Sequence, residues 1–283
     1  MTTVQSLTKV LPGVSALPLN NSVTKKRWYQ PTFSPEHGVL LVLLGAVLTG
    51  ASLAQTWTVD TSLACLAAFL GLQAEHPLVV QVKRRRQWRF RYLFWAGLYG
   101  TLALGLALYL SLQFPVLLWI CGVAVVALGI DIFSVVQRNQ KAVVNEIVMF
   151  SSICLSTLFV YGATTGTITL QSIGLWLLNS LFFSGAVFSV KLRKTKTSSL
   201  RSGVIYHIVA VVLVGGLYAL GWLSLFTALV YVIALLKLAV ITCWQNWYRT
   251  CRFEHIARFE TYFALTYTAL AALTVLPPKL PPA

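Results

Sequence analysis

Long apolar runs separated by short polar segments dominate the sequence from Gly38 almost to its C-terminal end. A helix that crosses a bilayer needs about 20 mostly apolar residues. Runs of this length predict nine such helices, at residues 38–56, 61–82, 92–112, 116–136, 143–162, 168–190, 202–221, 223–243 and 259–277. The pattern therefore predicts an all-α fold, a polytopic membrane bundle of about nine transmembrane helices.

The predicted bundle occupies residues 38–277 and leaves a short segment at each end. Residues 1–37 are rich in Ser, Thr, Pro and Lys and lack the apolar stretch of a signal peptide. We expect them to form a polar, flexible cytoplasmic tail, and residues 278–283 to form a short external tail.

Composition agrees with a membrane protein, because 57% of the residues are hydrophobic and only 10% are charged, whereas charged residues make up about 25% of soluble domains. The net charge of +15 would also suit a nucleic-acid-binding protein. In the nine-helix arrangement, however, every Lys and Arg except Lys279 falls on the side of the N-terminus. Short cytoplasmic loops of membrane proteins carry such an excess. The charge therefore predicts a cytoplasmic N-terminus, an external C-terminus and no nucleic-acid partner.

Ionisable and amide side chains recur at one depth inside the predicted helices. Glu75 precedes Lys83 by eight residues, which places it about 12 Å below the inner surface, and His207 lies about 9 Å below it. Charged side chains in a membrane usually face the bundle interior and a partner. We therefore expect one polar cavity on the inner side, lined by Glu75, His76, Asp131, Asn145, Glu146, His207 and Lys237.

Two other interpretations of this polar layer stay open. Each carboxylate can instead neutralise a neighbouring Lys or Arg and hold helices together without any ligand. A metal site is less well supported, because adjacent residues such as Glu75 and His76 point about 100° apart on a helix and do not converge on one ion. The sequence contains no HExxH or CxxC spacing, so no metal ligands are predicted.

Several stretches resemble one family of membrane proteins. "SPEHGVLLVLLGAVLTGA" in the first predicted helix and "FLGLQAEHPLVVQVKRR" in the second are similar to the YwiC-like membrane proteins, in particular to their cyanobacterial-type branch. "DIFSVVQRNQKAVVNEIVMFSSICLS" and "TTGTITLQSIGLWLLNSLFFSGAVFSVKLRK" extend the resemblance from Ser34 to Lys194. It implies a bacterial inner membrane or a thylakoid membrane as the location.

The layout also resembles, more distantly, the UbiA-type intramembrane prenyltransferases. Those proteins hold a prenyl diphosphate through Mg²⁺ bound by aspartate-rich motifs in their second and sixth helices. The matching positions here are Gln73, Pro77 and Gln81, and then Val187, Lys191 and Arg193. None of these side chains is a carboxylate ligand for Mg²⁺, so no cofactor is predicted and prenyl transfer of the usual kind is disfavoured.

The first functional hypothesis is a lipid-handling protein, and a diverged prenyltransferase-like enzyme is one form of it. It binds an isoprenoid or another lipid through an anionic head group at the inner face. Glu75 or Asp131 would act as acid and base, and His76 as proton relay, with Glu146 a further catalytic candidate. The head group would be bound by residues drawn from Arg84, Arg85, Arg138, Lys141, Asn145, Lys191, Arg193, His207 and Lys237.

Two hypotheses from other classes remain. A transporter of a small anion or metabolite is one, although no repeat of two halves and no polar layer in the outer half is visible. The other is a non-catalytic scaffold that assembles with other membrane proteins through small-residue patches such as "GAVLTGAS" and "GVAVVALG".

Overall fold

The computed structural model describes residues 29–34, 37–84, 87–193 and 199–276. The chain divides into two units, residues 1–30 and 31–283, and all that follows concerns the second. Within the described ranges every regular element is a helix, and the first six are α1 (His37–Ala54), α2 (Val59–Lys83), α3 (Phe90–Gln113), α4 (Leu117–Val136), α5 (Val143–Cys154) and α6 (Ser156–Thr165). They are followed by α7 (Leu170–Lys191), α8 (Leu200–Ala219), α9 (Leu225–Leu229), α10 (Val232–Cys243), α11 (Gln245–Thr250) and α12 (Phe253–Val275). The predicted all-α class is confirmed.

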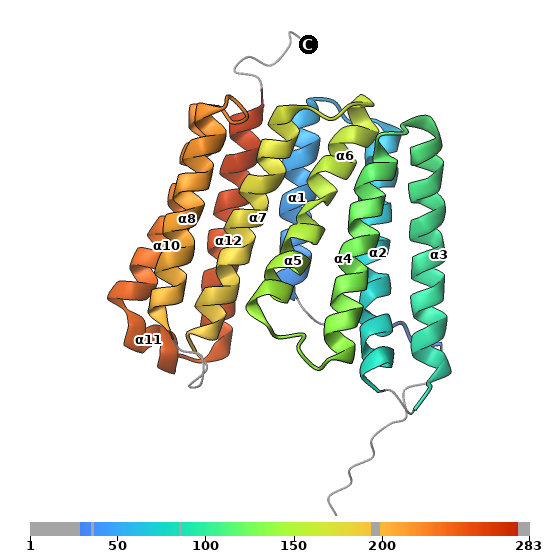
Figure 1. The fold of residues 1–283 in the computed structure, drawn as a ribbon, viewed down its shortest axis with the longest axis horizontal. Helices are drawn as coiled ribbons and strands as arrows, with labels where there is room; N and C mark the ends of the chain where they lie inside the picture. The colour runs from blue at the N-terminus through green and yellow to red at the C-terminus, as the bar shows by residue number, and fades with distance from the viewer. Residues whose placement is uncertain (1–28, 35–36, 85–86, 194–198, 277–283) are drawn as a thin grey trace, which may run out of the picture. The chain divides into compact units, whose positions relative to one another are not determined.

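Eight helical segments of the described chain are long and apolar enough to cross a membrane, which identifies an integral membrane protein. Two of these segments combine consecutive helices, α5 with α6 and α9 with α10. Helix α12, which corresponds to the ninth predicted span, is not among them but runs along the bundle beside α1 (Figure 1). The number nine therefore stays a prediction, as does the orientation.

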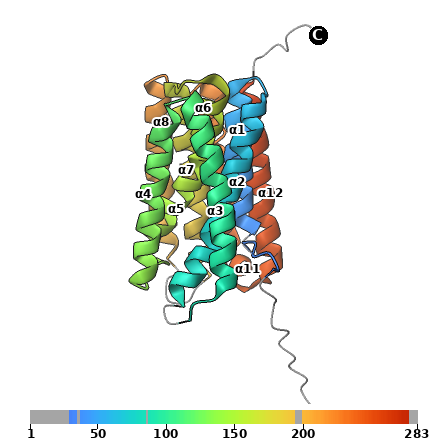
Figure 2. The same ribbon diagram turned by 90° about the vertical axis from the view of Figure 1, so that its right-hand side faces the viewer.

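Helix α1 packs against α5, α6, α7 and α12 (Figures 1 and 2). Two small residues allow this close packing. A Cβ added to Gly50 would lie 2.5 Å from the backbone oxygen of Thr157 in α6, and one added to Gly45 would lie 2.7 Å from the ring of Phe183 in α7. The small-residue patch "GAVLTGAS" is therefore part of the internal packing of the bundle.

The opposite surfaces of several helices are apolar and exposed. On α3 and α4, for example, Leu104, Trp119 and Val125 are all more than half exposed. Such a surface is unfavourable in water but suits contact with lipid tails, so these helices face the bilayer.

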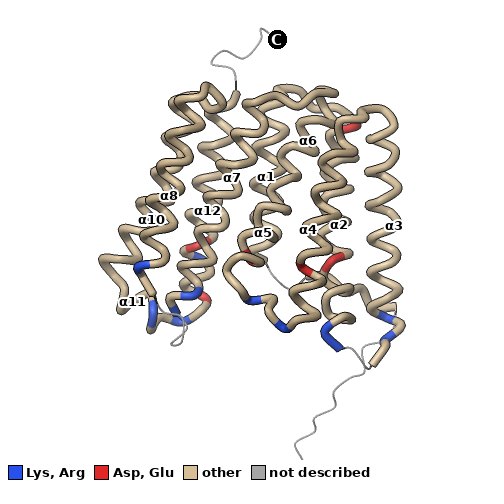
Figure 3. The backbone as a smooth tube through the Cα atoms, in the orientation of Figure 1, with Lys and Arg blue, Asp and Glu red and all other residues tan. Residues whose placement is uncertain are grey.

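Charge is segregated along the bundle. Lys and Arg gather at one end, which we call the basic end, and most Asp and Glu lie in the same half (Figure 3). Asp60 stands apart in the first turn of α2, at the end of that helix opposite to Lys83. The N-termini of α2 and α7 lie away from the basic end, and each is closed by a capping box, at Thr58 and Thr169 respectively.

Candidate functional site

A cavity of about 430 Å³ opens among α1, α2, α4, α5 and α7 near the basic end. Its size is typical of pockets that bind small molecules. Two kinds of side chain share its wall. The polar ones are Ser34, Glu75, His76, Lys83, Asp131, Gln140, Lys141, Asn145, Glu146 and Lys191, and the apolar ones are Val39, Leu72, Val79, Val80, Met149, Phe150, Ile153, Ala186, Val187 and Val190.

Asp131 and Asn145 form the most deeply buried polar pair on this wall. Asp131 is only 1% exposed, and its Oδ1 accepts a hydrogen bond of 2.8 Å from Nδ2 of Asn145. The same Nδ2 also lies 3.1 Å from the carbonyl oxygen of Gln140 in the α4–α5 connection. Oδ2 of Asp131 and Oδ1 of Asn145 have no hydrogen-bond partner among the described residues.

Glu146 and Lys191 link α5 to α7 across the cavity. The Nζ of Lys191 lies 2.7 Å from Oε2 of Glu146 and donates a hydrogen bond of 2.8 Å to the carbonyl oxygen of Lys141. Lys191 therefore neutralises Glu146, and its charge is already engaged within the protein.

Glu75 and His76 contribute the α2 side of the cavity. Pro77 follows them inside the helix and cannot donate the usual backbone hydrogen bond to the carbonyl of Gln73. Gln73 and Gln81, at two of the positions matched to the prenyltransferase aspartate motif, have backbone partners. Oε1 of Gln73 accepts a hydrogen bond from the backbone N–H of Ser34, and Oε1 of Gln81 accepts one from the backbone N–H of Arg89. The two glutamines therefore hold the segment before α1 and the segment after α2 against α2.

The remaining arginines predicted to bind an anion lie away from the cavity wall. Arg84 lies over the ring of Tyr92 at 5.3 Å, and Arg138 is exposed in the turn after α4. Arg193 donates a hydrogen bond of 2.6 Å to the carbonyl oxygen of Cys251. Arg85 lies outside the described residues. Of the predicted cationic clamps, the structure places only Lys141 and Lys191 on the cavity, and it adds Lys83, which the sequence reasoning did not select.

His207 and Lys237 do not share this cavity, which corrects the expectation of a single polar chamber. They line a separate, much smaller hollow of about 20 Å³ between α7, α8 and α10. His207 contacts the hydroxyl of Tyr231 through Nδ1 at 3.0 Å. His207 and Lys237 were assigned to the same polar layer as Glu75 and Asp131, but they lie on the side of α7 opposite to the large cavity.

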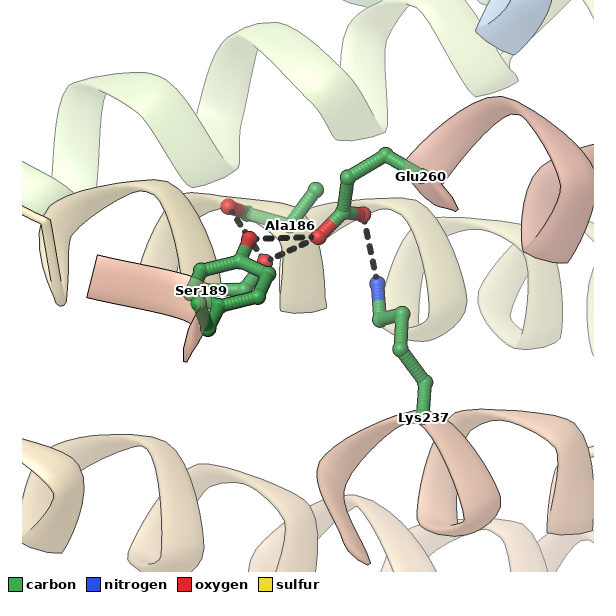
Figure 4. Close-up of polar contacts among 5 residues, drawn as sticks. Ala186, Ser189, Lys237 and Glu260 are labelled. Carbon is green, nitrogen blue, oxygen red and sulfur yellow. Dashed lines mark hydrogen bonds and ion pairs between the residues drawn. The ribbon is translucent and has the colours of Figure 1, made fainter. Parts of the chain in front are cut away.

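Lys237 belongs to a closed cluster around Glu260 (Figure 4). Its Nζ is 3.1 Å from Oε2 of Glu260, and the hydroxyls of Tyr248 and Ser189 each lie 2.9 Å from Oε1. Burial, with the Glu260 carboxylate close by, raises the pKa of the Tyr248 phenol well above its usual value, so this hydroxyl stays a donor. Both oxygens of Glu260 have partners, as expected of an ion pair that holds helices together.

A second satisfied network, centred on Asn179 in α7, was missed by the sequence reasoning. Nδ2 of Asn179 lies 2.8 Å from the hydroxyl of Thr49 and 3.0 Å from that of Thr157, and Oδ1 accepts from the hydroxyl of Tyr267 at 2.9 Å. The single amide within the apolar run "GLWLLNSLFF" was the signal for it, because polar side chains in membrane helices commonly hydrogen-bond across helices.

Within the described residues, no three His, Cys, Asp or Glu side chains group closely enough to hold a metal ion. The expectation that the protein uses no cofactor stays a prediction.

The fold and the cavity together define a class, an integral membrane protein built of apolar helices with a small-molecule-sized cavity at its basic end. Residues 33–161 match the model of the family described as YwiC-like protein. The match runs from just before α1 into α6 and confirms the family recognised from the quoted stretches. Comparison with curated proteins and with solved structures gives no match, so the resemblance to UbiA-type enzymes stays a prediction.

Proposed function

We propose that this protein binds an isoprenoid or another lipid in the cavity at the basic end. The observation that carries the proposal is the division of the cavity wall into an apolar part and a polar part. An amphipathic molecule can place its chain against Met149, Phe150 and Ile153 and its head group among the charged residues. Burial of the chain provides most of the binding free energy, at about 0.8 kcal/mol for each buried CH₂.

An anionic head group would contact Lys83 and Lys141. These two cations line the cavity and are exposed, whereas Lys191 is engaged with Glu146. Because neither lysine is deeply buried, each contact is expected to contribute no more than about 1 kcal/mol. Glu75 and Asp131 as acid and base, with His76 as proton relay and Glu146 as a further candidate, remain proposed catalytic roles.

The experiment is a lipid analysis of the purified full-length protein by native mass spectrometry and extraction. We expect a lipid to co-purify with the wild type and to be lost from Ala186→Trp or Met149→Trp, because an indole at either position fills the cavity. Val126→Trp, on the exposed face of α4, is the matched control and should retain the lipid. Repeated absence of lipid from the wild type, or equal lipid content in folded cavity-filled variants, would contradict the proposal.

We further propose that the basic end faces the cytoplasm of a bacterial inner membrane or the corresponding side of a thylakoid membrane, as the positive-inside rule predicts. Cys243 is exposed near the basic end, and Trp57 is exposed at the opposite end. In intact spheroplasts, a membrane-impermeant maleimide should label a Trp57→Cys variant and spare Cys243. Labelling of Cys243 alone would show the reverse orientation.

A further inference from the structure

The unpaired polar atoms of Asp131 and Asn145 distinguish the cavity from the hydrogen-bonded networks around Glu260 and Asn179. Glu260 has partners on both carboxylate oxygens, and both polar atoms of Asn179 are hydrogen-bonded. At the cavity, Oδ2 of Asp131 and Oδ1 of Asn145 have no partner among the described residues, although both side chains are at least 95% buried. Leaving a buried polar atom unpaired is unfavourable. Because Asp131 and Asn145 both line the cavity, the unpaired oxygens of this carboxylate and amide point to a ligand.

The chemistry of the two atoms restricts the group that can satisfy them. If Asp131 is ionised, both atoms accept hydrogen bonds and need a donor. If Asp131 is protonated on Oδ2, that atom donates while Oδ1 of Asn145 still accepts. A hydroxyl group satisfies both atoms when Asp131 is protonated, because it accepts from Oδ2 of Asp131 and donates to Oδ1 of Asn145, and it donates to one of the two atoms when Asp131 is ionised. An ammonium group can donate to both atoms only in the ionised state. A fully ionised phosphate can accept from Oδ2 of protonated Asp131 but has no hydrogen to donate to Asn145.

We infer that Asp131 and Asn145 form a hydroxyl-binding site, and that the cavity takes a lipid-soluble alcohol or phenol whose hydroxyl contacts Oδ2 of Asp131. The inference rests on the proposed lipid-binding function and specifies the head group. The hydrogen bond between Asn145 and Asp131 holds the carboxylate in place, and the apolar residues of α5 and α7 that line the same cavity receive the hydrocarbon chain.

The test compares the binding of four probes with one hydrocarbon chain to the full chain in nanodiscs. The probes are farnesol, farnesyl methyl ether, farnesylamine and farnesyl phosphate. A hydrogen bond to a charged group corresponds to a factor of about 10 to 100 in affinity. We therefore expect wild type to bind farnesol about 10- to 100-fold more tightly than the methyl ether, and Asp131→Leu to bind both equally weakly. Asp131→Asn should retain part of the preference, because an amide also donates and accepts.

Controls separate this site from a folding defect and from the wider proposal. Ser184→Ala removes another buried hydroxyl, which has no hydrogen-bond partner among the described residues and belongs to a residue that does not line the cavity. It should leave the preference for farnesol unchanged. Thermal unfolding of Asp131→Leu should match wild type or occur at higher temperature, because the substitution removes a buried carboxylate with an unpaired oxygen.

Three outcomes would overturn the inference. Equal affinity of wild type for farnesol and its ether would mean that only water occupies the pair. Tenfold tighter binding of farnesylamine than of farnesol would assign an ammonium group instead. A third outcome is that wild type does not bind farnesol, whereas wild type and Asp131→Leu both bind farnesyl phosphate tightly. This result would rule out the hydroxyl-binding site but would still support the proposed lipid-binding function. If no probe binds and no lipid co-purifies, the hydroxyl-binding site and the lipid-binding function are both contradicted.

Discussion

Replacement of Asn179 by Leu removes the central hydrogen-bond network of the bundle. Leu has the same number and branching of side-chain heavy atoms as Asn but is larger, so the change opens no cavity and acts through the lost hydrogen bonds and some overpacking. Three contacts disappear, to Thr49, Thr157 and Tyr267. Hydrogen bonds between membrane helices average about 0.6 kcal/mol and reach about 1.7 kcal/mol. The Tyr267 phenol is completely buried and would lose its acceptor, at a cost of about 1–3 kcal/mol.

We therefore expect Asn179→Leu to lower the free energy of unfolding by about 2–4 kcal/mol. The assay is reversible unfolding in mixed micelles by titration with a denaturing detergent, followed by tryptophan fluorescence. Asn246→Leu is the control, because Asn246 is exposed on α11 and its replacement should change stability by less than about 0.5 kcal/mol. Adding Tyr267→Phe to Asn179→Leu should cost nothing further. A change at Asn179 as small as the control would refute the reasoning, as would full additivity with Tyr267→Phe.

Two further predictions concern packing near α1 and α10. Lys237→Met leaves the carboxylate of Glu260 without its cation and should lower the free energy of unfolding by about 3–5 kcal/mol. Adding Glu260→Gln to this variant should recover most of that loss. A double variant that is no more stable than Lys237→Met alone would contradict the ion-pair interpretation. Gly50→Ala should cost at least about 1–3 kcal/mol, because its Cβ would lie 2.5 Å from the backbone oxygen of Thr157. A Cβ added to Gly105 in α3 would have no heavy atom within 4 Å, so Gly105→Ala should be neutral or slightly stabilising in the same unfolding assay. Equal effects of the two substitutions would contradict the argument that Gly50 is required for the close approach of α1 and α6.

The sequence allows a prediction of the depth of the polar residues, because depth follows from the fixed rise of a helix and from where the basic residues mark its end. Glu75, Asp131 and Glu146 were assigned to one level on three helices, and the structure brings all three to one cavity. The stretches that resemble YwiC-like proteins include the same three carboxylates, and so does the match to that family over residues 33–161.

Sequence could not predict which helices are neighbours. Hydropathy places a residue along the membrane normal but leaves the order of the helices around the bundle undetermined. The contacts of α1 with α7 and α12 depend on packing of small residues such as Gly45, and one sequence does not show the partner of such a residue. Glu260 of α12 likewise pairs with Lys237 of another helix, α10, and one sequence does not show this partner.

Helix α7 explains why one predicted polar layer became two separate sites. Ala186, Val187, Val190 and Lys191 line the large cavity, whereas Gly185, Phe188, Ser189 and Leu192 line the hollow that contains His207 and Lys237. Successive residues of a helix are rotated by about 100°, so Ser189 and Lys191, two positions apart, point in nearly opposite directions. Residues at one depth can therefore lie on either side of a single helix and never meet. Both oxygens of Glu260 have partners on one side of α7, while Oδ2 of Asp131 has none among the described residues on the other side. The proposed ligand therefore belongs on the α5-facing side of α7.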